Sequence, residues 1–528
     1  MNARTARALG LLGCVLAYGG DPAVVVEAGQ LRQTARPGTR EPVVALEDAF
    51  RHPPMSTRPS CYWWWLNNLV DKEGITHDLE EFKAKGLGGV MLVCSGNWSA
   101  AAPRQRGPSL LSPEWRELYQ HTLKEAARLG LEVSVNYYGN SPLYFAGDYS
   151  AELVWESVTP IVADWFHNFY ADRRIVEDNF TSADKWMLLM NRHLKPDSTI
   201  DRNEHGDWCD ASTMDKSGEM TDVDGNRRRY EFGATSGPLI ATAYHYNNCR
   251  IMARLAGTLG KVSEQKKYEE LAAKVKTGFN ARFFDPKTCK YWSDTQCAYV
   301  LSLAFGLTPE ENRERVIANL VENIMVKHKG HLSVGLIGMQ WLMQSLTDMG
   351  HPEDAYTIAT QTTRPSWGYM ISKGATTVWE KWDMDTQGPD MNSEALLILT
   401  GNLEAWFYQA LAGINCDPAQ PGFKHIIIKP LLLGDLTWVE ASHNSMHGLI
   451  ASHWRKRGDQ FTLEVTIPPN TSATIFVPSK DAVAVTESGK PAAKADGVKF
   501  LRTENNAAVY AVGSGTYRFK STLPQTTQ

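Results

Sequence analysis

The feature that most constrains this chain is a change in the spacing of its apolar residues near residue 420. Between about 150 and 413, apolar side chains recur every three to four residues, as on one face of a helix. Beyond 420 they alternate, so that Phe461, Leu463 and Val465 share one face of a strand. Helices followed by strands of period two predict a helical domain and then a β-sandwich.

The helical region divides into segments that each suit one helix. Gly260, Gly350 and Gly413 stand where three of them end, as expected for a helix C-terminus. Splitting the first segment near Asp172 gives about nine helices. The segments are 152–195, 238–260, 262–283, 294–306, 308–326, 335–349, 352–363 and 393–413. Paired helices of this length indicate an (α/α)6 toroid, which would have twelve helices when complete. The sequence therefore predicts a mainly α protein with an incomplete toroid.

The segment before the toroid has a different rhythm, in which strands alternate with helices. Residues 61–66, 89–94 and 131–137 have the apolar content of strands. The intervening helices are expected at 76–86 and 112–130. This order predicts a parallel sheet in a partial β/α-barrel-like segment. We place that segment at 50–147, the toroid at 148–415 and an antiparallel sandwich at 416–522.

The N-terminal residues carry signs of export. Arg4 and Arg7 precede a short apolar run, which resembles a secretory signal peptide over residues 1–29. Residues 11–14 (LLGC) loosely resemble a lipoprotein box, so a lipid anchor at Cys14 is an alternative. Residues 30–49 look like a linker. We expect a periplasmic or extracellular protein. No later segment approaches the roughly 20 apolar residues of a membrane helix, so no membrane span is expected.

Composition excludes several kinds of partner. The net charge of -5 gives no reason to expect nucleic acid. The 17 Trp and 19 Tyr suit stacking against sugars, but they also suit packing in a helical barrel. The eight cysteines show no metal-ligand spacing, so we expect no metal and no cofactor. Cys289 and Cys297 could pair, although free buried thiols are the expected state. The oligomeric state is not predicted.

Two segments place carboxylates among aromatic residues outside any helical period: 204–210 (EHGDWCD) and 374–383 (GATTVWEKWD). In the second, Glu380 follows Trp379 and precedes Trp382 by two residues. Hydrolysis of a glycosidic bond usually needs two carboxyl groups, one of which can activate water. Desolvation by the indoles would raise the pKa of Glu380 and suit it to a general base. The alternative is that Glu380 caps a helix or pairs with Lys381.

Both segments, with several others, resemble glycoside hydrolase family 78 over residues 150–520. The other matching motifs are 241–244 (ATAY), 294–296 (DTQ), 331–338 (HLSVGLIG), 360–369 (TQTTRPSWGY) and 418–430 (PAQPGFKHIIIKP). The resemblance implies an α-L-rhamnosidase that hydrolyses terminal α-L-rhamnosides with inversion. It also implies a rhamnose-containing glycoside or polysaccharide as substrate, and Glu380 as general base. The sugar-binding positions that it implies are Asp207, Trp208, Asp210, His331, Trp367, Trp379 and Trp382.

The sequence departs from that family at its front. The family's general acid lies in an Asp-Cys-Pro-x-Arg motif, which this sequence does not contain. Residues 50–145 resemble instead the start of the β/α-barrel of glycoside hydrolase family 106. Three alternatives to an active α-L-rhamnosidase therefore stay open. The chain could be a catalytically impaired rhamnoside-binding fusion relic, an unstable fusion product, or a hydrolase of another hexose.

Overall fold

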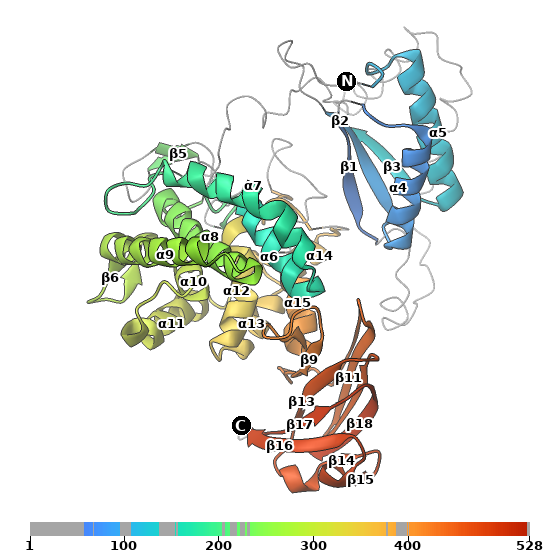
Figure 1. The fold of residues 1–528 in the computed structure, drawn as a ribbon, viewed down its shortest axis with the longest axis vertical. Coiled ribbons are helices and arrows are strands. Elements are labelled where there is room, and N and C mark those ends of the chain that lie inside the picture. Colours follow the sequence, from blue (N-terminus) through green and yellow to red (C-terminus); the bar gives the residue numbers. More distant parts are fainter. Residues whose placement is uncertain are drawn as a thin grey trace. The chain divides into compact units, whose positions relative to one another are not determined.

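The computed structural model describes most of the chain beyond residue 57. The described residues are 58–66, 68–95, 107–136, 154, 157–202, 206–211, 219–221, 227–229, 233–375, 378–386, 399 and 401–524. They form a β/α segment, a helical domain and a β-sandwich, coloured blue, green to yellow, and orange to red in Figure 1. The expected signal peptide and linker, 1–29 and 30–49, lie outside the described residues.

The β/α segment has the predicted parallel sheet. Its elements are β1 (Ser60–Leu66), α4 (Lys72–Ala84), β2 (Gly89–Ser95), α5 (Pro113–Leu129) and β3 (Glu132–Asn136). The strand order is β1-β2-β3, and both pairings are parallel. Local signals set the ends of α5: the Ser112 hydroxyl accepts the Trp115 N–H at 3.2 Å, and Gly130 adopts φ 64°. The predicted parallel sheet is confirmed.

The helical domain follows a short turn at Val154. Its helices are α6 (Val158–Tyr170), α7 (Arg173–Asn191), α8 (Gly237–Leu259), α9 (Val262–Phe283), α10 (Gln296–Ala304), α11 (Arg313–Glu322), α12 (Leu336–Asp348), α13 (Pro352–Ala359), α14 (Trp367–Ser372) and α15 (Leu403–Trp406). π-Helical turns extend α11 over Asn323–Lys327 and α15 over Phe407–Leu411. Two small hairpins, β4 (Glu219–Thr221) with β5 (Arg227–Arg229) and β6 (Phe284–Asp285) with β7 (Lys290–Tyr291), lie between helices.

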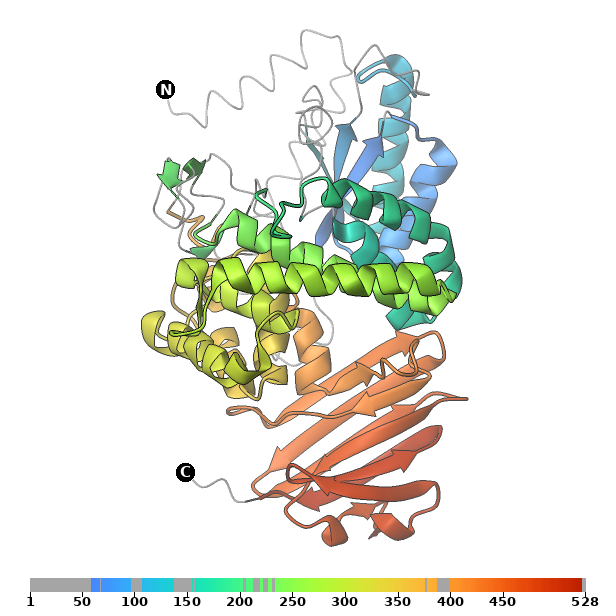
Figure 2. The same ribbon diagram turned by 60° about the vertical axis from the view of Figure 1, so that its left-hand side comes forward.

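Local features of the sequence explain why most of these helices could be predicted. Helix α8 is buried along most of its length and lies beside α9, with which it forms a hairpin closed by Gly260 at φ 72° (Figures 1 and 2). The predicted split near Asp172 is confirmed, because its carboxylate accepts the Arg174 N–H at 2.9 Å and starts α7. Helix α14 was not predicted. It is six residues long, too short to show a period.

The sandwich consists of two sheets that enclose a common core, drawn in orange to red in Figure 2. One sheet has the order β10-β11-β12-β18-β14-β15 and the other β16-β17-β13-β9-β8. The strands are β8 (Ile414–Cys416), β9 (His425–Ile428), β10 (Trp438–Ser445), β11 (Gly448–Arg457), β12 (Gln460–Ile467), β13 (Ser472–Pro478), β14 (Thr486–Glu487), β15 (Lys490–Pro491), β16 (Val498–Glu504), β17 (Ala507–Val512) and β18 (Gly515–Thr522). The pairings are antiparallel as predicted, except that β9 and β13 are parallel. The paired residues of these two strands are 47 positions apart in the sequence. The alternation of apolar residues within each strand could therefore not predict the parallel pairing.

The seven cysteines within the described part of the chain are free thiols. Cys289 and Cys297 are both buried and do not form the disulfide considered from the sequence. Cys14 lies outside the described residues. Among the helices that the structure describes, none combines the length and the apolar character needed to cross a membrane.

Candidate active site

Three segments that are distant in the sequence meet around Glu380: the turn 206–211, the segment 331–338 and the turn 378–386. The Trp208 indole N–H donates to the Glu380 carboxylate, with Nε1 and Oε1 3.4 Å apart. The Trp382 indole N–H donates to the Val334 carbonyl at 3.3 Å. Residues 172 positions apart thus come into contact. The structure brings together the two carboxylate-bearing segments that the sequence singled out.

Glu380 lies in an irregular turn, flanked by buried indoles. Trp379 is 6% exposed and Trp382 1%, whereas the Glu380 side chain is partly exposed. The described residues 378–386 form turns and no helix, so Glu380 caps none there. A carboxylate that reaches solvent from an apolar wall can take a proton from a water molecule at the surface of that wall.

Asp207 is completely buried, and its carboxylate is bonded to protein. It accepts the backbone N–H of Gly335 at Oδ2 and those of Ile337 and Gly338 at Oδ1, each at 2.9 Å. These N–H groups belong to the N-terminus of α12, where no earlier turn supplies carbonyl acceptors. Burial raises the pKa of Asp207, and these N–H donors act in the opposite direction. The contact of Asp207 with a sugar stays a prediction, whereas its hydrogen bonds to the N-terminus of α12 are observed.

The turn that carries Trp208 lies directly against that helix end. The Trp208 carbonyl accepts the Leu336 N–H at 2.9 Å. A Cβ on Gly335 would lie 2.2 Å from the Trp208 carbonyl oxygen, so only glycine permits this approach. Asp210, 2% exposed, accepts the Ala234 N–H at 2.8 Å and fixes the other end of the turn. Asp210 is therefore placed as a structural group, and its sugar contact also stays a prediction.

His331 is partly exposed at the edge of the same segment. Its Nδ1 lies 3.1 Å from the His328 carbonyl, which can only accept, so Nδ1 carries a hydrogen. Nε2 lies 2.8 Å from the Thr363 hydroxyl. Behind it, the buried Gln296 amide accepts the Ser333 N–H at 2.7 Å and donates to the His331 carbonyl at 3.2 Å. The sequence marked residues 294–296 without a role, and the structure shows that Gln296 fixes the backbone of this segment.

Trp367 and Trp382 form the wall behind the site. Trp367, 7% exposed, donates to the Leu399 carbonyl at 3.0 Å. Its ring meets that of Trp382 edge to face, with centroids 5.9 Å apart at 70°. These buried rings keep the turn 378–386 in place. Of the four predicted tryptophans, Trp208 is the one that is only half-buried.

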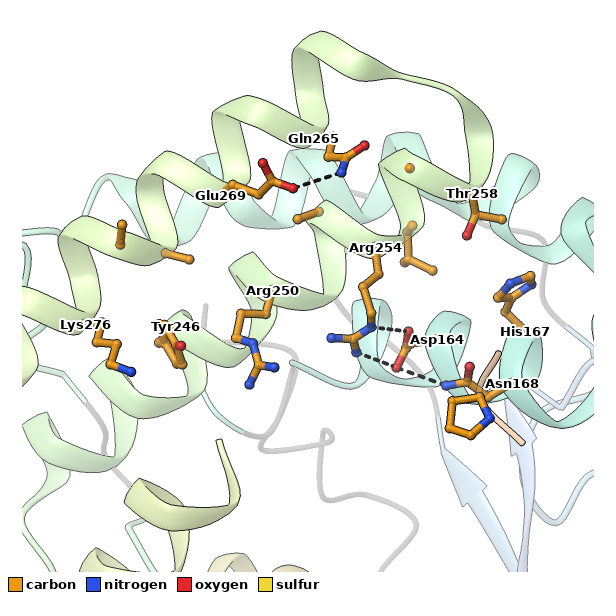
Figure 3. Close-up of a pocket in the computed structure, with 16 residues that line it drawn as sticks. Asp164, His167, Asn168, Tyr246, Arg250, Arg254, Thr258, Gln265, Glu269 and Lys276 are labelled. Atoms are coloured by element: carbon orange, nitrogen blue, oxygen red, sulfur yellow. Dashed lines mark hydrogen bonds and ion pairs between the residues drawn. The ribbon is translucent and has the colours of Figure 1, made fainter. Parts of the chain in front are cut away.

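A groove of about 730 Å³ lies elsewhere, lined by α6, α8, α9 and Pro418 (Figure 3). Its charged groups bind the protein itself: Arg254 pairs with Asp164 at 2.8 Å, and Arg250 and Lys276 donate to carbonyls at the end of α10. None of its lining residues belongs to the segments around Glu380. In the described part of the chain, no group of three or more His, Cys, Asp or Glu could hold a metal ion.

A helical toroid, a following β-sandwich and a glutamate set between tryptophans define a glycosidase of the six-hairpin class. The chain belongs to the bacterial α-L-rhamnosidase six-hairpin glycosidase family, whose domain model matches residues 115–411. The C-terminal domain of bacterial α-L-rhamnosidases matches residues 413–492. A separate α-L-rhamnosidase family model, that of glycoside hydrolase family 106, matches residues 51–143. The resemblances noted in both parts of the sequence are thereby confirmed.

Individual relatives agree with this assignment. An α-L-rhamnosidase of Streptomyces avermitilis is 32% identical over 68% of this chain and 32% of its own length. One from Formosa agariphila is 30% identical over 70% of this chain and 38% of its own. The crystal structure of the Streptomyces avermitilis enzyme complexed with L-rhamnose has a TM-score of 0.58 to this structure. An α-L-rhamnosidase from Dictyoglumus thermophilum, 30% identical, has a TM-score of 0.62 and covers 70% of this chain and 40% of its own. The chain thus spans about a third of the length of its curated relatives.

Proposed function

We propose that this chain hydrolyses terminal α-L-rhamnosides, with Glu380 as the general base. In this reaction Glu380 takes a proton from water while the water oxygen attacks the anomeric carbon. The bond to the leaving oxygen breaks, and the configuration at that carbon inverts. The observation that carries the proposal is a partly exposed carboxylate among buried indoles, in a member of the α-L-rhamnosidase family.

The substrate class rests on the family and its relatives. The Streptomyces avermitilis relative was crystallised with L-rhamnose. Among the residues predicted to bind sugar, Trp208 and His331 are the more exposed, so we propose that these two contact the rhamnose ring. We propose that Asp207, Asp210, Trp367, Trp379 and Trp382 act mainly by holding the site together. No general acid is assigned, because the sequence has no Asp-Cys-Pro-x-Arg motif.

The test is rhamnose release from 2,4-dinitrophenyl α-L-rhamnoside by the full chain. This leaving group departs without protonation, so the assay depends on the base and the sugar pocket rather than on an acid. Glu380→Gln should abolish release, and proton NMR should show β-L-rhamnose as the first product. Glu464→Gln, which changes an exposed carboxylate on β12 beside Arg518, is the control and should leave the rate unchanged.

Two results would contradict the proposal. Release that persists in Glu380→Gln would mean that another group activates water. A folded wild-type chain that binds rhamnose but releases none would show a binding protein instead of a hydrolase.

A further inference from the structure

We infer that Asp207 is a positioning residue that aims the Trp208 indole N–H at the Glu380 carboxylate. This inference rests on the proposed role of Glu380 as base. It differs from the role that the family resemblance implies for Asp207, which is direct contact with the sugar. Three observations carry it: the complete burial of Asp207, its three backbone partners, and the place of Trp208 next to it in the turn.

The first step is the anchoring of α12 by Asp207. An α-helix leaves its first N–H groups without intrahelical acceptors, and its N-terminus favours negative charge. Helix α12 has no side-chain cap of its own at Gly335. Asp207 supplies the missing acceptors from 128 residues away. The helix end and the turn 206–211 are therefore held as one unit.

The second step is the backbone of Trp208. Its carbonyl accepts the Leu336 N–H at 2.9 Å, so α12 binds the turn on both sides of the Trp208 Cα. The Asp207 carbonyl also accepts the Asp210 N–H at 3.1 Å, which closes the turn. These hydrogen bonds restrain the peptide planes on both sides of the Trp208 Cα. They therefore also fix the direction of its Cα–Cβ bond, which carries the indole.

The third step is the contact with Glu380. A donor to a carboxylate stabilises the ionised form, which is the form a general base needs, and it orients the other oxygen. The Nε1 to Oε1 distance is 3.4 Å, near the upper limit for a hydrogen bond. A small displacement of the turn is then enough to break the contact. Asp207 can therefore act on Glu380 without touching it.

The variants separate anchoring from sugar binding. Asp207→Asn keeps the shape but turns an N–H group of the amide toward a backbone N–H. Trp208→Phe keeps a ring but removes the donor. Asp164→Asn is the matched control, because Asp164 is also buried but pairs with Arg254 on α8, in the groove that contains no site residue. Glu380→Gln, measured first, establishes whether the proposed function holds.

The first readout is the pH profile of kcat and KM on the dinitrophenyl substrate. Trp208→Phe should move the acidic limb of kcat/KM up by roughly one unit, the effect of losing a hydrogen bond to a charged group. Asp207→Asn should move the same limb in the same direction and lower kcat by about 10-fold to 100-fold. The double variant should move the limb no further than Trp208→Phe. Asp164→Asn should lower the melting temperature without moving the limb. The other titratable groups on these segments are Cys209, Asp210, His331, Lys381, Asp383 and Asp385, and Cys297 of α10 and Tyr244 of α8 face Asp207 from the neighbouring helices; all are unchanged in every variant.

The second readout needs no activity. In protein labelled with ¹⁵N-tryptophan, the Trp208 indole resonance, assigned through Trp208→Phe, should titrate with Glu380. That titration should vanish in Glu380→Gln and weaken in Asp207→Asn. An indole titration without any rhamnose release would refute the proposed function and leave the positioning contact standing.

Two outcomes would overturn the inference. An unchanged acidic limb and an unchanged indole titration in Asp207→Asn would leave Asp207 with a purely structural role. A raised KM with unchanged kcat would favour direct sugar contact instead. If Asp207→Asn does not fold, Gly335→Ala displaces the same turn with Asp207 intact, and it should produce the same indole change.

Discussion

Gly335→Ala should disrupt the site through a single added methyl group. Gly335 precedes α12, and its backbone lies against the turn 206–211. A Cβ there would lie 2.2 Å from the Trp208 carbonyl oxygen, 2.4 Å from the Asp207 carbonyl oxygen and 2.7 Å from the Asp210 nitrogen. Its φ of -104° is accessible to alanine, so the cost is steric. All three clashing atoms are backbone atoms, which cannot rotate away.

The magnitude follows from these distances. Relief of the shortest contact requires a displacement of about 1 Å, toward the usual separation of non-bonded heavy atoms. Overpacking of this kind costs about 1–3 kcal/mol. Loss of the hydrogen bond from the Leu336 N–H to the Trp208 carbonyl adds about 1 kcal/mol. We therefore expect the helical domain to lose about 2–4 kcal/mol, and its melting temperature to fall by roughly 5–10 °C.

Differential scanning calorimetry of the full chain measures this loss, with rhamnose release as the second readout. The control is Gly257→Ala in the last turn of α8, where the nearest atom is the end of the flexible Gln265 side chain at 3.1 Å. That change should leave the melting temperature equal or higher, since alanine favours a helix by about 1 kcal/mol. A Gly335→Ala protein as stable and as active as the wild type would refute the close packing of the turn against α12.

Other predictions concern the core and one helix cap. Burial lowers the pKa of His245 to about 4, from about 6.5 in the unfolded chain, so its contribution to stability is complete above pH 6.5 and is lost as the pH falls toward 4. The loss amounts to about 3 kcal/mol of unfolding free energy. His245→Phe should remove most of this pH dependence, measured by urea unfolding at several pH values between 7 and 4.5; an unchanged slope of the unfolding free energy against pH would contradict this. Burial also raises the thiol pKa of Cys249 and Cys297, so a thiol reagent at pH 8 should label them only after unfolding, and rapid labelling of native protein would show otherwise. Ser366→Ala should cost about 1 kcal/mol, because the Ser366 hydroxyl accepts the Tyr369 N–H at the start of α14; Ser366→Thr should recover most of it.

The sequence by itself determined the class of fold and singled out one residue of the candidate site. Helices α8 and α9 begin and end within a residue of their predicted bounds, because their apolar spacing and the Gly260 that ends α8 are local features. The alternation of apolar and polar side chains that predicted the sandwich strands is also a local feature of the sequence. Glu380 could be singled out since two tryptophans, Trp379 and Trp382, are its sequence neighbours, whereas its contact with Trp208 could not be predicted in this way.

Only the tertiary structure shows which groups the Asp207 carboxylate binds. An aspartate in an aromatic loop suits a sugar-binding group and a remote helix cap equally well by sequence. The difference lies in three backbone N–H groups about 130 residues further along the chain, and no local pattern in the sequence predicts that they bind Asp207. The same holds for Gln296 and for the parallel pairing of β9 with β13. Hydrogen bonds between distant segments depend on how the elements pack, so the chain specifies them only once it has folded.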